Sequence, residues 1–316
     1  MKKSIVTIIS IIGFTALSSL HGQNCDSLYI SSLTSFDEKE YTESIETINT
    51  CINVCPDHEK YYLHKAKAYY NIHNIIKTIQ SLHKAIDIND TCIEAYTLRA
   101  QIYLDQHFLA KAIDDYEKIF TILPQLHTQF TPIYHLNLSK AYNNTRQYHK
   151  AYDLLKNVED KAEGSIGYHA NISVSCMYLN KETEAKFHLQ KCLEIDPGFT
   201  GGLVNMGYYL VTKKEYKKAI EYFDKALVKN PREAYALNNR GFAYFKLHKY
   251  AKALDDVNQS IKLQPDNSFA YKNRGLIYSK TGLTEDACKD FEKALKLGYT
   301  EMYDKEVEML HKKICK

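Results

Sequence analysis

From residue 137 onwards, asparagine recurs along the chain at a fixed interval. The row consists of Asn137, Asn171, Asn205, Asn239 and Asn273, whose sequence numbers rise in equal steps of 34. An amide side chain offers both a donor and an acceptor, the two groups that every peptide unit presents. Amides in register could therefore hold the backbone of an extended polypeptide. The alternative is that they bond only to neighbouring elements of the protein itself.

Two pairs of potential metal ligands occur at helical spacing, His188 with Cys192 and His311 with Cys315. Neither pair has a third ligand nearby in sequence, whereas structural zinc sites need four. The sequence also has no phosphate-binding glycine loop, HExxH motif, CxxC motif or nucleophile elbow. We therefore expect no metal site, no cofactor, no catalytic residue and no enzyme activity.

The same interval governs many residues besides asparagine. The clearest unit, 234–267, carries Gly241, Ala253, Ser260 and Pro265 at repeat positions 8, 20, 27 and 32. Small residues at the first three positions allow two antiparallel helices to approach closely, and larger residues fill the space between hairpins. The proline ends the second helix. A fixed period of this length predicts a tandem array of helical hairpins.

Counting in steps of 34 divides most of the chain into eight repeats, with one five-residue insertion at 127–131. The array covers 25–301, and its repeats are 25–58, 59–92, 93–126, 132–165, 166–199, 200–233, 234–267 and 268–301. Residues 302–316 are expected to form a C-terminal capping helix, with Thr300 as its N-cap. Its apolar stripe would be Tyr303, Val307, Leu310 and Ile314.

This pattern resembles the tetratricopeptide repeat, a helix–turn–helix unit with the same small and aromatic positions. The match is strongest in the last three repeats. The resemblance implies an all-α, right-handed superhelix of about eight hairpins plus the capping helix. It also implies that the first helix of each repeat lines a concave groove, with positions 2, 5, 6, 9, 12 and 13 facing it.

The expected groove positions of the last repeats mix aromatic rings, amides and a few lysines, which is typical of a surface that holds an extended peptide. The predicted peptide-binding residues are the five asparagines of the row with Tyr208, Phe242, Lys246 and Lys272. A similar superfamily device, the carboxylate clamp with which heat-shock cochaperones bind acidic tails, is not matched by any three consecutive repeats. Binding of such tails is therefore not expected.

Residues 1–22 have the composition of a secretory signal peptide. Lys2 and Lys3 precede an apolar run over 5–17, and small residues follow, so cleavage is expected near Gly22. The alternative is a retained membrane anchor, for which the run is short. Loss of the two lysines changes the formal charge from +3 to +1, with 39 basic residues against 38 acidic ones. Such a balance argues against nucleic-acid binding.

Export would place the cysteines in an oxidising compartment. Cys25 and Cys55 occupy positions 1 and 31 of the first repeat, where the two ends of an antiparallel hairpin meet, so we predict a disulfide between them. Other cysteines fall at small-residue or packing positions and are expected to be buried. Three more have no obvious partner, and their redox state is left open, with reduced thiols as one alternative: Cys92, Cys288 and Cys315.

These observations together predict a non-enzymatic interaction scaffold, exported to the bacterial periplasm or envelope, that binds a protein or an extended peptide in its groove. The alternative is a structural or accessory subunit of an envelope enzyme or secretion assembly, with an empty groove. The expected partners are proteins or peptides, with no nucleic acid, and a membrane only through an uncleaved leader. The oligomeric state is left open.

Overall fold

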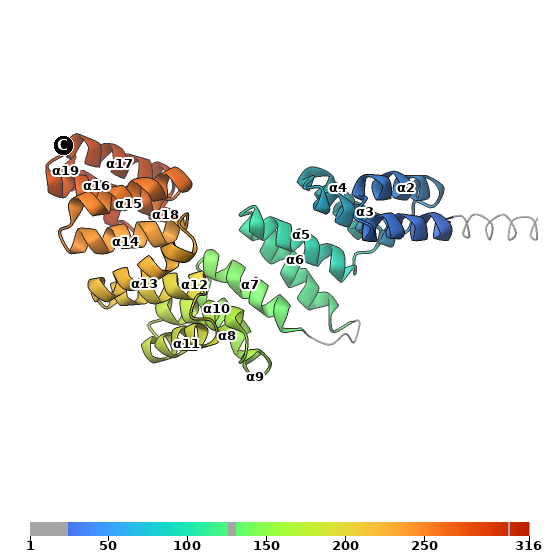
Figure 1. Cartoon of the computed structure of the whole chain (residues 1–316), viewed down its shortest axis with the longest axis horizontal. Helices are drawn as coiled ribbons and strands as arrows, with labels where there is room; N and C mark the ends of the chain where they lie inside the picture. The colour runs from blue at the N-terminus through green and yellow to red at the C-terminus, as the bar shows by residue number, and fades with distance from the viewer. Residues whose placement is uncertain (1–24, 126–130, 303, 316) are drawn as a thin grey trace, which may run out of the picture. The chain divides into compact units, whose positions relative to one another are not determined.

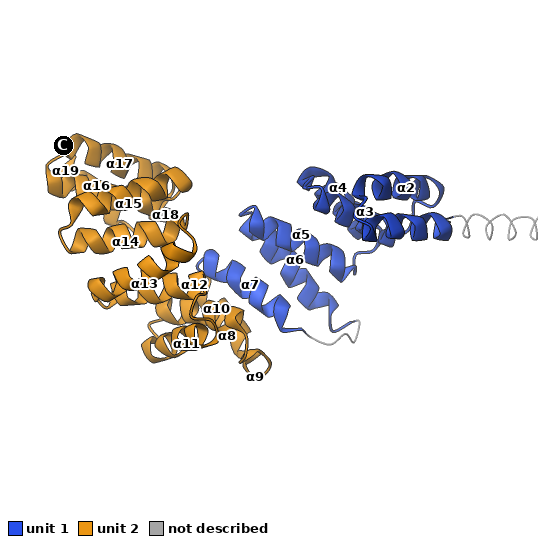
Figure 2. Ribbon diagram, in the orientation of Figure 1, with its two compact units in different colours: residues 1–146 blue, residues 147–316 orange. Residues whose placement is uncertain are grey.

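A computed structural model describes residues 25–125, 131–302 and 304–315, and all regular structure in these residues is α-helical (Figure 1). The chain divides into two compact units, Met1–Arg146 and Gln147–Lys316 (Figure 2). The expected signal peptide and nearly all of the insertion at 127–131 lie outside the described residues. Every helix in the described part of the chain is too short or too polar to traverse a lipid bilayer.

The first unit consists of consecutive antiparallel helices. A helix over residues 25–37 is followed by α2 (Tyr41–Val54), α3 (Glu59–Asn71), α4 (Ile75–Ile88), α5 (Ile93–Asp105), α6 (Leu109–Ile122) and α7 (Pro132–Asn144). Helices α3 and α4 pack together as one hairpin, and α5 and α6 pack together as the next. Helix α7 ends this unit.

The second unit continues the same arrangement. It contains α8 (Tyr148–Lys156), α9 (Glu159–Ala162), α10 (Ile166–Tyr178), α11 (Glu182–Ile195), α12 (Thr200–Thr212), α13 (Tyr216–Lys229), α14 (Ala234–Lys246), α15 (Tyr250–Leu263), α16 (Ser268–Thr281), α17 (Thr284–Lys296), α18 (Tyr299–Met302) and α19 (Glu306–Ile314). Four hairpins, from α10–α11 to α16–α17, pack in sequence. The boundary between the units falls between α7 and α8, inside the range 132–165 that the sequence predicts as one repeat.

One backbone conformation turns the chain in every repeat. Repeat position 15 has a positive φ in all eight: Lys39, His73, His107, Arg146, Asn180, Lys214, His248 and Gly282. The left-handed residue lets the next N–H reach back to the carbonyl five residues earlier, as in the 2.9 Å bond from Glu215 to Leu210. The turn keeps its phase on both sides of the insertion, in agreement with the tandem hairpins that the sequence predicts.

The expected close approach of the two helices is visible at repeat position 8. A Cβ atom added to Gly207 would lie 2.5 Å from the ring of Phe223, and one added to Gly241 would lie 2.6 Å from a methyl group of Val257. Phe223 and Val257, at position 24, are fully buried. A residue larger than glycine at these two sites would therefore push the helices apart.

Buried arginine–aspartate pairs connect the helices of several repeats. Arg240 of α14 donates to both carboxylate oxygens of Asp256 in α15, at 2.8 and 2.7 Å, and to Asp224 of the preceding hairpin at 2.6 Å. The bond to Asp256 is the largest cause that raises the pKa of Arg240. Arg99 with Asp115 and Arg274 with Asp290 repeat the two-bond pairing at the same repeat positions.

The C-terminal end differs in detail from the expectation. Thr300 lies within the short helix α18, so it does not cap the final helix, which begins at Glu306. Val307 of α19 is fully buried against the last hairpin, while Leu310 and Ile314 pack partly buried beside it. A disulfide joins Cys288 of α17 to Cys315, two cysteines for which the sequence indicates no partner. A second disulfide joins Cys25 to Cys55 across the first hairpin.

Replacing Arg240 with methionine is expected to lower the free energy of unfolding by about 3 kcal/mol, because Asp256 would be left as an unpaired buried charge. The Asp256 side chain is only 4% exposed. The measurement is the urea unfolding midpoint of the mature chain. The control is Lys218→Met, which removes an exposed pair with Glu215 and should cost less than about 1 kcal/mol. Equal losses in the two variants would contradict a special role for the buried pair.

Candidate functional site

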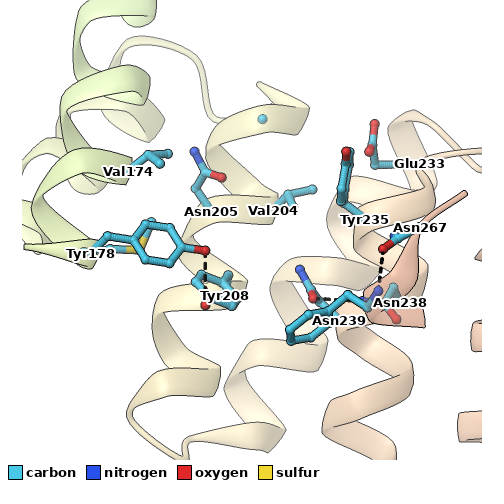
Figure 3. A pocket seen from close by; sticks show the side chains of 13 residues that line it. Val174, Tyr178, Val204, Asn205, Tyr208, Glu233, Tyr235, Asn238, Asn239 and Asn267 are labelled. Carbon is cyan, nitrogen blue, oxygen red and sulfur yellow. Dashed lines mark hydrogen bonds between the residues drawn. The ribbon is translucent and has the colours of Figure 1, made fainter. Parts of the chain in front are cut away.

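The second unit contains an open hollow of about 340 Å³ (Figure 3). Its walls come from the first helices of four successive hairpins, α10, α12, α14 and α16, and from the residues just before the last two. The lining residues are Val174, Met177, Tyr178, Gly201, Val204, Asn205, Tyr208, Glu233, Tyr235, Asn238, Asn239, Asn267 and Phe269. Apart from Glu233 and Asn267, all of them occupy repeat positions 2, 5, 6, 9, 12 or 13. These are the positions that the family resemblance assigns to the groove.

Three of the predicted peptide-binding residues lie together in this hollow. Asn205 and Tyr208 come from α12, and Asn239 comes from α14. All three side chains are partly exposed. Asn171 is half-buried on α10 and does not line the hollow, and Asn137 belongs to α7 in the first unit. The asparagines therefore share a repeat position without sharing one environment.

Asn273 faces the interior of the last repeats. It is 1% exposed, and its amide nitrogen donates to the side-chain oxygen of Asn238 at 2.9 Å. Asn238 in turn donates to the oxygen of Asn239 at 3.5 Å. A chain of amides thus runs from the buried Asn273 to the wall of the hollow. Asn273 therefore bonds within the protein, which is the alternative to ligand binding stated for the asparagine row. Its role is to orient the side chain of Asn238.

The remaining predicted residues form a cluster of cations and rings beside the hollow. The ammonium of Lys246 lies 5.0 Å from the ring centre of Phe242. Lys272 is 5% exposed, lies 4.6 Å from the ring centre of Phe269, and pairs with Glu306 of α19 at 2.8 Å. Because the cap neutralises Lys272, this lysine contributes packing and not an open positive charge. Lys246 is exposed.

Several lining residues are not among the predicted peptide-binding residues. Tyr235 is 52% exposed, which is unusual for a large ring in a folded core. Tyr178 packs parallel to Tyr148, with ring centres 4.2 Å apart, and its hydroxyl lies 3.4 Å from that of Tyr208. Both Tyr235 and Tyr178 stand at expected groove positions, so the repeat register does indicate that they face the groove. Glu233 precedes α14 and carries no such signal.

Neither candidate pair of metal ligands is arranged around an ion site. The His188 ring lies beside His169, with their Nδ1 atoms 2.9 Å apart, and burial followed by this neighbour lowers the pKa of His188 to about 4. Cys192 is a buried thiol, and Cys315 is held in a disulfide. Within the described residues, no group of three or more potential ligands comes together.

The first unit has a hollow of its own, about 510 Å³ in volume. Its lining residues are Phe36, Lys67, Tyr70, Asn71, Glu94, Thr97, Leu98, Gln101 and Tyr134. Most of them occupy the same repeat positions as the lining of the second unit. Leu98 stands where Asn205 stands in α12, and Lys67 pairs with Glu94 at 3.5 Å. The first unit therefore has a similar groove, but asparagine does not recur at repeat position 6 along it.

Consecutive helical hairpins whose first helices line an open hollow define a helical-repeat protein. Two family models described as tetratricopeptide repeat match residues 234–267 and residues 166–199, 201–227 and 270–297. A third, described as the second ARM domain of tetratricopeptide repeat protein 21, matches residues 29–107. The chain is a tetratricopeptide repeat protein, and such repeats suggest a protein–protein interaction scaffold.

Solved structures with the same fold have low sequence identity to this chain. A tetratricopeptide repeat protein from Parabacteroides merdae is 18% identical with a TM-score of 0.61, and the match covers 80% of this chain and 97% of that one. A chain of the Cut9–Hcn1 hetero-tetramer of the APC/C is 17% identical with a TM-score of 0.64, covering 96% and 58%. At these identities the likeness is one of fold alone.

Curated relatives share only part of their length with the chain. DnaJ homolog subfamily C member 7 from Homo sapiens is 33% identical over 130 residues, and the same protein from Mus musculus is 26% identical over 130 residues. Each match covers 40% of this chain and 26% of the relative. The chain thus spans about a quarter of the length of these relatives.

Replacing Asn273 with alanine is expected to lower the free energy of unfolding by about 1–3 kcal/mol, because Asn238 would lose its buried donor. The change Asn205→Ala should cost less than about 0.5 kcal/mol, because that amide borders the open hollow. Thermal unfolding of both variants of the mature chain provides the comparison. A larger loss in the Asn205 variant would contradict the environments described above.

Proposed function

We propose that the protein binds an extended segment of a partner protein in the hollow of the second unit. The observation that carries this proposal is the lining itself, in which partly exposed amides and aromatic rings converge from four successive repeats. Asn205 and Asn239 supply donors and acceptors for a backbone, and Tyr208 and Tyr235 supply ring surface for side chains. No enzymatic step is part of this proposal.

The geometry favours an extended chain as the bound form. The lining residues come from successive first helices at the same repeat positions, so similar groups recur along the wall. A segment that presents peptide groups at regular intervals can satisfy such a row. Asn239 is already held through its oxygen by Asn238, which leaves its NH₂ group to donate to a ligand. This preorganisation reduces the entropy lost on binding.

We also propose that the protein is exported to the bacterial periplasm or envelope. The composition of residues 1–22 supports export. The disulfides Cys25–Cys55 and Cys288–Cys315 also support it, because such bonds persist in oxidising compartments. They close the first hairpin and attach the final helix, the two ends at which a repeat array lacks a neighbour.

The peptide-binding proposal is tested by selecting a phage-displayed library of random dodecapeptides on the immobilised mature chain. We expect enrichment of peptides whose affinity falls about 5- to 150-fold in the double variant Asn205→Ala/Asn239→Ala, because two amide–backbone bonds are lost. The control is Asn144→Ala, which changes an exposed asparagine of the first unit. Failure to enrich any peptide, or unchanged affinity in a folded double variant, would argue for a groove that stays empty in function.

The export proposal is tested by expressing the full-length chain in a bacterium and sequencing the N-terminus of the protein recovered from the envelope fraction. We expect a new N-terminus near residue 23 and, after alkylation without reductant, unlabelled Cys25, Cys55, Cys288 and Cys315. Deleting residues 2–22 should leave the chain in the cytoplasm. An intact Met1 on envelope material would instead indicate a retained anchor.

A further inference from the structure

The one formal charge on the lining of the hollow in the second unit is negative. Glu233 is the one charged side chain among the 13 residues that line it. Its position before α14 is that of an N-cap, yet its carboxylate makes no capping bond. The carboxylate accepts a hydrogen bond from the Asn230 amide at 3.3 Å, and no lysine or arginine of the described residues pairs with it. Its negative charge is therefore uncompensated.

A second carboxylate adds to the negative potential on the same side. Asp266 is exposed at the end of the next hairpin, one residue before Asn267 of the lining. Partial burial raises the pKa of the Tyr235 hydroxyl, and the negative charges of Glu233 and Asp266 raise it further. In Figure 3 Glu233 and Tyr235 lie next to each other on the wall that begins α14.

The other walls are suited to the stem of a long side chain. Met177 and Val204 are apolar, and the rings of Tyr178 and Tyr208 lie beside them. Lys272 of the neighbouring α16 is buried against Phe269 and paired with Glu306, so it does not neutralise Glu233. A side chain with an aliphatic stem and a cationic end suits this hollow. The stem can lie on the apolar residues, and the cation can reach the carboxylate and the exposed ring at the edge.

We infer that the hollow recognises a lysine or arginine side chain of the bound segment, with its stem on Val204 and Met177 and its head group at Glu233 and Tyr235. This inference rests on the proposed function and adds the chemistry of the ligand. It separates the site from one that binds acidic tails, because a carboxylate ligand would meet Glu233 and Asp266 as like charges. Backbone pairing by Asn205 and Asn239 would fix the segment, and the acidic edge would select its side chain.

The probe is the set of dodecapeptides selected on the mature chain, resynthesised with a fluorescent label. We expect a lysine or arginine at a fixed position in the set. Changing that residue to norleucine should weaken binding about three- to tenfold to the mature chain, and the difference should shrink in roughly 0.5 M salt. In the variant Glu233→Gln, the lysine and norleucine peptides should bind within about twofold of each other.

The matched control is Glu194→Gln, which removes an exposed carboxylate of α11 that pairs with Lys191 outside the hollow. It should leave the preference for lysine unchanged. Selected peptides that lack a common basic residue, or a lysine preference that survives Glu233→Gln, would overturn the inference while leaving the groove as a peptide site. A library that yields no binder at all would instead remove the proposed function, and the inference with it.

Discussion

The close contact between the two helices of each hairpin is the constraint on which the other features depend. At Gly207 and Gly241 the second helix lies so near that a Cβ atom has no room, and a left-handed residue at position 15 brings the chain back at the required angle. Once this contact is fixed, the side chains of the first helix divide into a face that packs on the partner and a face that does not. The second face forms the hollows of both units.

Much of the fold follows from the sequence because the same packing rule recurs in every repeat. Small residues at positions 8, 20 and 27 are easy to recognise, since only a few residue types are small enough to fit between the two helices of a hairpin. The left-handed turn cannot be recognised from the sequence, because position 15 is lysine, histidine, arginine or asparagine in seven of the eight repeats and glycine in only one. The Cys288–Cys315 disulfide could not be predicted from the sequence for a different reason. It joins a repeat to the cap, so no repeat register predicts it.

The candidate site was predictable only in part, and the asparagine row shows why. Repeat position defines where a Cα lies relative to the hairpin, but the neighbours decide what the side chain meets. Asn205 borders the hollow, whereas Asn273 meets Asn238 and is buried. Glu233 precedes its helix and is not at one of the expected groove positions, so periodicity gives no signal for it. Its significance comes from the lining around it, whose other described residues carry no charge.

The different environment of the last repeat follows from its place beside the cap. In the second unit the first helix of each repeat from α10 to α14 packs against the first helix of the next repeat. The last repeat is followed instead by α18 and α19, which pack on α17, and α19 brings Glu306 to Lys272. The lysine is thereby drawn against Phe269 and away from solvent, and Asn273 beside it is buried as well. The contact between Glu306 and Lys272 thus keeps a positive charge away from the acidic edge of the hollow.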